Sequence, residues 1–409
     1  MIKIDLPCTE QPHQGVQLPV ASVNNSIDSQ CWDVDRTLTA SLSQLLQLYK
    51  MHAAKLDSRV VVSGGLQQYL NHRRHADEAW TEQPRKGAGS VTTTINDLPD
   101  TILLHIFENL DTTNLCRISA VCRRWYSVSS DDILWRKKLE SDMFTWSIVG
   151  HMTNPDLYKE CQSDWSNKEI YLQCWPEMQS LTRQQNSTFL QISSVLRSLW
   201  PKKTPRVAMF GPGLESSTSG LVRKIIYEEN PVFQKLAMFP GKFGGVGAGF
   251  TIKITSGATF HLSTLYTSTK EERQGLQPGE RLQHNRMLAA EEGLEQPCYQ
   301  LRPALQELCR TLDAFVFVVD AGLDAKAVSC GRSELFAMVN ELWAASGVPV
   351  LVLSSIRDTS YSRLSCMEVV RSLHLGELNR PWQVRDCVVD GLVGVQESLE
   401  WLVDMAQKR

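Results

Sequence analysis

The sequence predicts a multidomain protein, in which a small all-α bundle and a helical linker precede an α/β domain with a mixed, mostly parallel sheet. Two observations support this fold class. Between Ile95 and Leu139, four short stretches of helical periodicity are separated by polar residues that favour helix starts. From Arg206 to Arg409, continuous apolar stretches alternate with amphipathic ones, which is typical of parallel strands and of helices that cover both faces of a sheet.

The overall composition narrows the class of protein. The chain of 409 residues is 42% hydrophobic and 21% charged, with a net charge of −3, so we expect globular domains and no direct contact with nucleic acid. Its longest apolar runs are too short to cross a membrane, and its N-terminus lacks a secretory signal. The 11 cysteines are odd in number and lack a Cys-x-x-Cys pair, so we expect free thiols, no metal site and a cytoplasmic or also nuclear location.

Changes in composition divide the chain into four regions. Residues 1–90 are polar and irregular apart from one amphipathic helix predicted at Leu38–Leu56. Residues 91–140 form the predicted bundle, residues 141–204 a helical linker, and residues 205–409 the α/β domain. The helix at Leu38–Leu56 either packs on its own protein or mediates a homodimer, and the sequence favours neither.

Each helix of the bundle has its own start signal. Pro99 is favoured in a first helical turn and precedes apolar residues at helical spacing. Asp111 can cap a second helix, Trp125 belongs to a third, and Asp131 or Asp132 can cap a fourth. A bundle of this size buries little core, so its many large apolar residues predict an interface.

The order and spacing of these residues resemble an F-box. Leu98-Pro99 matches its opening, the run Val121-Cys122-Arg123-Arg124-Trp125 a later landmark, and Leu134-Trp135 its end. The resemblance implies that the segment docks a Skp-type adaptor, and through it a cullin and a RING protein, by laying an apolar helix face into a partner groove. The residues predicted to make this contact, the last three of them shared with the bundle's own core, are Leu98, Pro99, Ile102, Leu103, Ile106, Leu115, Val121, Cys122 and Trp125. The alternative is an unspecialised helical bundle or a helix-turn-helix, and the acidic residues of the segment disfavour DNA binding.

The order of elements in the α/β region resembles that of a small GTPase: a strand, a loop, a helix, a hairpin and then repeated strand–helix units. The strands are expected at Arg206–Phe210, Phe250–Thr255, Phe260–Thr267, Ala314–Asp320, Val348–Ser354 and Val384–Val389. The helices are expected at Ser219–Tyr227, Arg332–Ala345, Leu364–Leu373 and Val395–Met405. We expect the glycine-rich run Pro240–Gly249 to be a loop, and Lys270–Arg310 to consist of charged, helix-favouring segments.

The residues that a GTPase needs for nucleotide chemistry are missing. A phosphate loop has the pattern Gly-x4-Gly-Lys-Ser/Thr, in which the lysine neutralises the β- and γ-phosphates. Registers starting at Gly211 or Gly213 both lack that lysine, and the Asn-Lys that should precede a guanine-reading Asp358 is replaced by Ser355-Ile356. The positions that correspond to the lost nucleotide site are Gly211, Gly213, Ser216, Ser217, Thr218 and Asp358. We therefore expect a GTPase-shaped domain without a nucleotide cofactor or catalysis.

An F-box followed by a degenerate GTPase-like domain resembles the F-box only protein 4 family, as do Val207–Glu215 and Val350–Ser354 in detail. The resemblance implies a non-catalytic substrate receptor of an SCF ubiquitin ligase, whose GTPase-like domain holds the substrate. In the family, substrates include a telomeric-repeat-binding factor, bound by addition to a sheet edge, and D-type cyclins. The candidate edges here are the hairpin edge and the opposite edge near Val384–Val389, unless residues 140–204 or the glycine-rich loop cover them.

Two other functions remain open at the level of sequence. The chain could be a regulatory GTPase with an atypical loop, which nucleotide co-purification would reveal. It could also be an F-box scaffold that binds a partner without causing its degradation. Ubiquitination of a bound partner would separate this scaffold from a ligase receptor.

Overall fold

The computed structural model describes residues 95–161, 164–179, 203–239, 246–267, 284–291 and 298–409. The predicted helix at Leu38–Leu56 lies outside these residues. Residues Thr93–Arg409 form one compact unit. In the described part of the chain, no helix is both long enough and apolar enough to span a membrane. The predicted fold class is confirmed, because a small helical bundle and a linker precede an α/β domain with a mostly parallel mixed sheet.

Short capped helices build the bundle, as the sequence predicts. Its elements are η1 (Ile95–Asp97), α3 (Asp100–Glu108), α4 (Thr112–Ile118), α5 (Arg123–Ser129) and α6 (Asp132–Asp142). The Asp111 carboxylate accepts a hydrogen bond from Asn114 N–H at 2.6 Å, and Asp131 accepts one from Ile133 N–H at 2.9 Å. These caps satisfy main-chain donors that a helix start leaves unpaired.

The linker consists of short elements that connect the bundle to the sheet. They are β1 (Ile148–Gly150), η2 (His151–Thr153), α7 (Pro155–Glu160) and α8 (Asn167–Cys174). Ser166 and Glu169 form a capping box at the start of α8. The strand β1 joins the sheet of the α/β domain, so the linker contributes an element to that domain.

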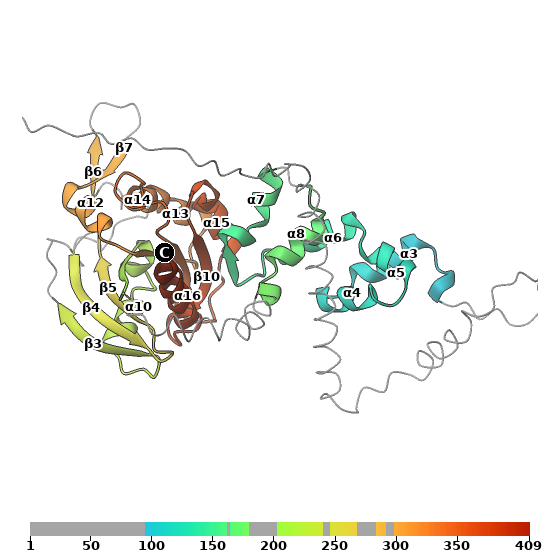
Figure 1. The fold of residues 1–409 in the computed structure, drawn as a ribbon, viewed down its shortest axis with the longest axis horizontal. Helices are drawn as coiled ribbons and strands as arrows, with labels where there is room; N and C mark the ends of the chain where they lie inside the picture. Colours follow the sequence, from blue (N-terminus) through green and yellow to red (C-terminus); the bar gives the residue numbers. More distant parts are fainter. Residues whose placement is uncertain (1–94, 162–163, 180–202, 240–245, 268–283, 292–297) are drawn as a thin grey trace, which may run out of the picture. The chain divides into compact units, whose positions relative to one another are not determined.

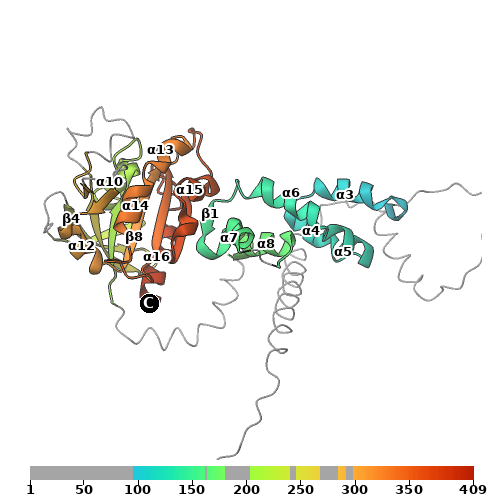
Figure 2. The same ribbon diagram turned by 90° about the horizontal axis from the view of Figure 1, so that it is seen from above.

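Eight strands form the main sheet, in the order β1-β10-β9-β8-β2-β5-β4-β3. Besides β1, they are β2 (Arg206–Phe210), β3 (Phe233–Phe239), β4 (Val246–Ile254), β5 (Thr259–Leu265), β8 (Ala314–Asp320), β9 (Val350–Ile356) and β10 (Trp382–Val388). The central pairs from β5 to β10 are parallel, whereas β3–β4, β4–β5 and β1–β10 are antiparallel. In Figures 1 and 2, helices flank this sheet on both faces.

Two apolar cores lie on the two faces of the sheet. The helical elements are η3 (Pro212–Leu214), α10 (Gly220–Ile226), α12 (Pro303–Arg310), α13 (Ala325–Ser329), α14 (Arg332–Met338), α15 (Cys366–Ser372), η4 (Leu375–Glu377) and α16 (Val395–Lys408). Phe315 and Phe317 of β8 belong to one core, and Val316 and Val318 to the other. This alternation follows from the two-residue period of a strand. The helices α10 and α16 pack in the second core, and α14 and α15 in the first.

Two loop and helix predictions need correction on either side of β5. The run Pro240–Gly249 was expected as a loop, yet Val246–Gly249 begins β4, because Gly249 lies between partners on both sides, Phe239 in β3 and Ser263 in β5. Within Lys270–Arg310, the described residues form the two-stranded sheet of β6 (Leu288–Glu291) and β7 (Cys298–Leu301) before α12 begins. Such pairings depend on distant residues, which local composition does not report.

The helix expected at Arg332–Ala345 ends earlier, at Met338. The buried guanidinium of Arg380 donates hydrogen bonds to the carbonyl groups of Val339 at 2.5 Å and Ala344 at 3.3 Å. These carbonyl groups therefore have a partner outside the helix, and the chain turns toward β9. A residue 41 positions away from Val339 thus decides where α14 ends.

Candidate functional site

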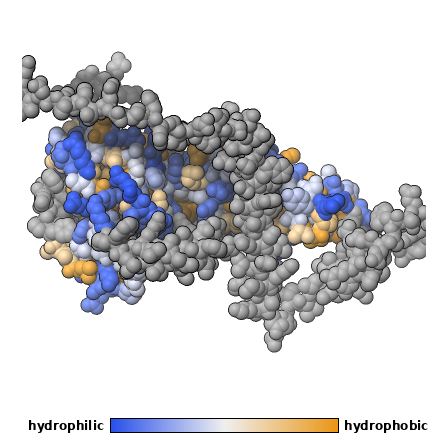
Figure 3. Space-filling view, in the orientation of Figure 1, coloured by the Kyte–Doolittle hydropathy of each residue, from blue (hydrophilic) through white to orange (hydrophobic). Residues whose placement is uncertain are grey.

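The F-box helices expose part of their apolar surface. Ile102 and Ile106, one turn apart on α3, are 47% and 40% exposed, and Val121 before α5 is 47% exposed. Pro99 is also exposed, and Leu98 is half-buried. Figure 3 shows apolar surface over these helices. The predicted contact residues at these positions are accessible to a partner.

Other predicted contact residues serve the bundle itself. Leu103 and Leu115 are 0% exposed and lie in the core, so we correct their assignment to the adaptor contact. Cys122 caps α5 by accepting a hydrogen bond from Trp125 N–H at 3.5 Å, and the Trp125 ring packs edge-on against Phe107 with centroids 5.5 Å apart. Both residues are half-buried and stabilise the bundle. Periodicity identifies apolar positions, but it does not distinguish the inner from the outer side of a small bundle.

The start of α3 is held in place by α5. Arg124 donates to the Leu98 carbonyl oxygen at 2.5 Å and to the Asp100 carboxylate at 2.7 Å. The sequence pattern did not predict this positioning role. It also did not single out two apolar side chains, Tyr126 and Ile133, that are each 58% exposed. The sequence signal that could have identified them is the excess of large apolar residues over what so small a bundle can bury.

The loop of Gly211 to Thr218, where the sequence predicts a degenerate phosphate loop, lies directly against β8. Gly211 has a φ of 119°, and a Cβ atom added there would lie 2.5 Å from the Val318 carbonyl oxygen. A Cβ atom on Gly213 would lie 2.7 Å from Val318 Cγ1. Both glycines are therefore required for the close approach of the loop to the sheet. In this chain, the loop packs its own backbone against β8.

The polar side chains of the loop form hydrogen bonds with other groups of the same domain. Ser217 donates to the Asp320 carboxylate at 2.5 Å, and Thr218, which is fully buried, donates to the Gly213 carbonyl oxygen at 2.7 Å. The Ser216 and Thr218 hydroxyl oxygens are 3.2 Å apart. The structure thus brings together five of the six predicted positions. The hydroxyl groups are engaged within the protein.

Asp358 lies apart from this cluster, beyond the end of β9. Its carboxylate accepts hydrogen bonds from both the N–H and the hydroxyl group of Ser360, which lower the pKa of Asp358. This arrangement caps a turn. Among the described residues, no group of three or more His, Cys, Asp or Glu side chains could hold a metal ion.

The linker covers one of the two candidate sheet edges. Val149 of β1 pairs with Val384 of β10, and Asp386 N–H donates to the Ser147 carbonyl oxygen at 2.9 Å. The edge near Val384–Val389 is therefore occupied, and we correct its candidacy. The other candidate was the edge of the predicted hairpin. Because β3 pairs with β4 of that hairpin, the edge of the sheet at this end is β3 instead.

The strand β3 is the outermost strand at the opposite side of the sheet (Figure 1). Ile254 donates its N–H to Ala258 within the neighbouring hairpin, so its pairing with Phe233 lacks direct hydrogen bonds. The main-chain groups of Phe233 and of Lys235, two residues on, hence point away from β4, and the Phe233 N–H donates to the Asn230 side-chain oxygen at 2.6 Å. Within the described residues, no strand pairs with that side. The outward-facing main-chain groups of Lys235 can pair with an incoming strand.

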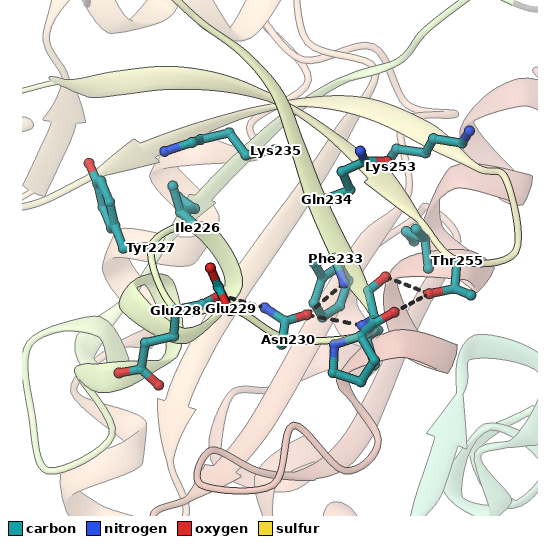
Figure 4. A pocket seen from close by; sticks show the side chains of 13 residues that line it. Ile226, Tyr227, Glu228, Glu229, Asn230, Phe233, Gln234, Lys235, Lys253 and Thr255 are labelled. Carbon is teal, nitrogen blue, oxygen red and sulfur yellow. Dashed lines mark hydrogen bonds between the residues drawn. The ribbon is translucent and has the colours of Figure 1, made fainter.

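Apolar and charged side chains surround this edge. Leu236 sits at a bulge in the β3–β4 register and is 50% exposed, and Met238 is 67% exposed. Figure 3 shows apolar surface over this end of the sheet. An open hollow of about 640 Å³ runs from the end of α10 along the first half of β3. In Figure 4, Lys235 extends toward Tyr227, and its Nζ lies 5.1 Å from the ring centroid.

Comparisons with known proteins agree with both halves of the fold. The family described as F-box-like matches residues 95–141, and the ADP-ribosylation factor family matches residues 298–406. F-box only protein 4 of Mus musculus is 29% identical over 337 residues, which are 80% of this chain and 87% of that protein. The Bos taurus protein is 28% identical over 354 residues, which are 84% and 90% of the two chains. The chain is a homologue of F-box only protein 4.

The family match to ADP-ribosylation factors covers the second half of the α/β domain. ADP-ribosylation factor-like protein 3 of Chlamydomonas reinhardtii is 30% identical over 104 residues, which are 25% of this chain and 57% of that protein. The family match begins at β7 and ends in α16, so it does not include the loop of Gly211 to Thr218. The chain therefore has an Arf-like region, and the loop of Gly211 to Thr218 lies outside that match.

Proposed function

We propose that this protein is the substrate-recognition subunit of an SCF-type ubiquitin ligase. The single observation that carries the proposal is the exposed pair Ile102 and Ile106 on α3, within the segment that matches the F-box-like family. An amphipathic helix with exposed apolar residues one turn apart is suited to a partner groove. The partner is a Skp-type adaptor, which links the chain to a cullin and a RING protein.

The F-box contact is best tested by placing charges on its exposed residues. In the double variant Ile102→Asp and Ile106→Asp, we expect adaptor affinity to fall at least about 30-fold, because two apolar anchors are lost. Unfolding of the chain should change little, since neither side chain is buried. Titration of purified adaptor, followed by ubiquitin transfer in a reconstituted complex, measures both steps.

The matched control is Ser141→Asp, an exposed position near the end of α6. It should bind the adaptor like the unmodified chain. Equal affinity for the double variant and the unmodified chain would refute the contact, and binding of the intact chain to no adaptor would refute the ligase assignment altogether.

The substrate is held by the α/β domain at the outer edge of β3. The outward main-chain groups of Lys235, together with the exposed Leu236 and Met238, support this part of the proposal. The first proteins to test are the substrate classes implied by the family resemblance, a telomeric-repeat-binding factor and a D-type cyclin. Bound substrate would receive ubiquitin and be degraded by the proteasome. A bound partner that receives no ubiquitin would favour the non-degradative scaffold.

The α/β domain acts in this scheme without nucleotide turnover. The absence of the phosphate-loop lysine and the packing of Gly211 and Gly213 against β8 support this view. We also propose a cytoplasmic and nuclear location, where the free thiols of the chain would remain reduced. A homodimer formed through Leu38–Leu56 is part of the same proposal, and light scattering of the chain without residues 1–90 would test it.

A further inference from the structure

We infer that Arg371 and Asp156 are positioning residues for ubiquitin transfer. Their ion pair locks the linker that carries the F-box bundle onto the α/β domain. The inference rests on the proposed ligase function and adds to it a determinant that lies outside both binding surfaces.

The α8 end of the linker is joined to the F-box bundle. The Asp132 carboxylate accepts hydrogen bonds from the main-chain N–H and the side-chain amide of Asn167, at 2.8 and 2.7 Å. The Tyr171 hydroxyl is within 2.7 Å of both the Thr112 hydroxyl and the Asp142 carboxylate. Tyr171 is buried, so these bonds are shielded from water. The helix α8 is therefore bound to α4 and α6.

The β1 end of the linker is joined to the sheet. Its three residues pair with β10, and the central residue Val149 is buried against the first core. This core contains Leu103 of the bundle, Trp146 of the linker and Trp382 of β10 in one apolar cluster. A pairing of three residues is a short ladder, so its stability depends on neighbouring contacts.

Arg371 supplies such a contact from α15. Its Nε and Nη2 atoms donate to the two carboxylate oxygens of Asp156 in α7 at 2.8 and 3.0 Å, a bidentate arrangement. The guanidinium also lies 5.4 Å from the ring centroid of Phe144, which directly follows α6 and Met143. One side chain of the α/β domain thus holds the linker on both sides of β1. The pair is partly exposed, with 43% and 23% of the two side chains accessible, so it can be exchanged without opening the core.

Ubiquitin transfer depends on the orientation of the acceptor lysine, because a misplacement of about 1 Å can slow a reaction roughly 100-fold. The adaptor would bind the F-box bundle and the substrate the α/β domain. The linker contacts connect these two regions. Loosening the lock should leave both binding steps intact and slow the transfer.

The test uses the full chain in a reconstituted complex with adaptor, cullin and RING protein. The acceptors are two lysines of the α/β domain itself, Lys235 and Lys253, because no substrate needs to be assumed. The variants are Arg371→Asp, Asp156→Arg and the double exchange of both, which restores a pair of opposite charges. The matched control is Arg332→Asp, which removes an ion pair with Glu377 inside the α/β domain. The rate of transfer to each lysine is measured at saturating ubiquitin-conjugating enzyme, with hydrogen exchange of the β1 amides alongside.

We expect each single variant to bind the adaptor normally, to exchange its β1 amides faster and to transfer ubiquitin to Lys235 and Lys253 about tenfold more slowly. The double exchange should recover most of the rate, and Arg332→Asp should not change it. An unchanged rate of ubiquitin transfer in the single variants overturns the positioning role, even if hydrogen exchange of the β1 amides becomes faster. Unchanged hydrogen exchange of these amides in the single variants overturns the lock itself. If the intact chain transfers no ubiquitin, the ligase assignment fails instead, and hydrogen exchange still decides whether the lock exists.

Discussion

Adjacent residues of α3 serve different purposes because a helix turns by about 100° per residue. Ile102 is 47% exposed, whereas Leu103 beside it is 0% exposed and packs in the bundle. The same contrast separates Leu115 from Val121. A residue of the F-box match therefore either packs in the bundle or stays accessible at its surface. Substitution of a packed residue should lower stability, whereas substitution of an accessible one should change it little.

Leu103→Ala should destabilise the chain without removing an exposed contact. We expect the free energy of unfolding to fall by about 2–5 kcal/mol, because the substitution leaves a cavity in a closed core. Urea unfolding measures this loss. The matched variant Ile102→Ala should cost far less. Equal losses in the free energy of unfolding for the two variants would contradict the conclusion that Leu103 is buried and Ile102 is exposed.

His151 should make the stability of the chain depend on pH. Burial lowers the pKa of His151 from 6.5, so below that pH the unfolded chain binds a proton that the folded chain resists. Stability should therefore fall as the pH decreases from 6.5 toward the lower pKa of the folded state. His151→Gln should reduce this fall, measured by urea unfolding across the range. A wild-type slope that persists in His151→Gln would contradict the assignment.

At the scale of elements, the edges of the sheet determine what the α/β domain can bind. The linker strand β1 closes the edge at β10, and β3 remains as the outer strand at the other end. The loop between β2 and α10 packs closely onto β8 through Gly211 and Gly213. Both features arise from pairing between distant segments. The domain therefore keeps a GTPase-like order of strands with a different accessible surface.

Proline substitutions can test which main-chain groups of β3 face outward. Lys235→Pro removes an outward N–H, so substrate should bind at least about tenfold more weakly while the domain stays folded. Gln234→Pro removes a group that faces β4, so it should lower the stability of the domain. Binding of the two candidate substrates, together with urea unfolding, checks both. Undiminished substrate binding by folded Lys235→Pro would exclude this edge.

The contact between the loop of Gly211 to Thr218 and β8 makes Gly213 sensitive to substitution. In Gly213→Ala, the new Cβ would lie 2.7 Å from Val318 Cγ1 and 2.9 Å from the Val319 carbonyl carbon. We expect a loss of about 1–3 kcal/mol in the free energy of unfolding. Gly220→Ala in α10 is the control, since its Cβ would meet only Val389 Cγ1 at 3.7 Å, and alanine favours a helix. A neutral Gly213→Ala would mean that the loop stands away from β8.

At the scale of the whole molecule, the chain joins a partner-binding bundle to a sheet through a linker that belongs structurally to both. The apolar cluster on one face of the sheet includes Leu103 of the bundle, Trp146 of the linker and Val384 of β10. Adaptor binding and substrate binding would thus take place on connected elements. This connection is what a receptor subunit requires, since it must present one protein to enzymes held by another.

The whole chain should gain no stability from guanine nucleotides. A ligand at 100 times its dissociation constant raises the free energy of unfolding by about 2.7 kcal/mol. We expect no shift in Tm with millimolar GTP or GDP and Mg²⁺, because the loop lacks its lysine and its hydroxyl groups are bonded within the protein. A small GTPase under the same conditions is the positive control. A clear rise in Tm would revive the regulatory GTPase as the function of this domain.

The sequence by itself determined the features that depend on local pattern and residue type. Helical periodicity and caps such as Asp111 placed the four bundle helices, and the continuous apolar run of β8 identified a buried strand. Tertiary structure alone decided which of Ile102 and Leu103 is exposed. It also decided that β1 covers β10, and that β3 becomes the free edge. The physical reason is that burial and strand pairing depend on residues far apart in the chain, which local periodicity does not encode.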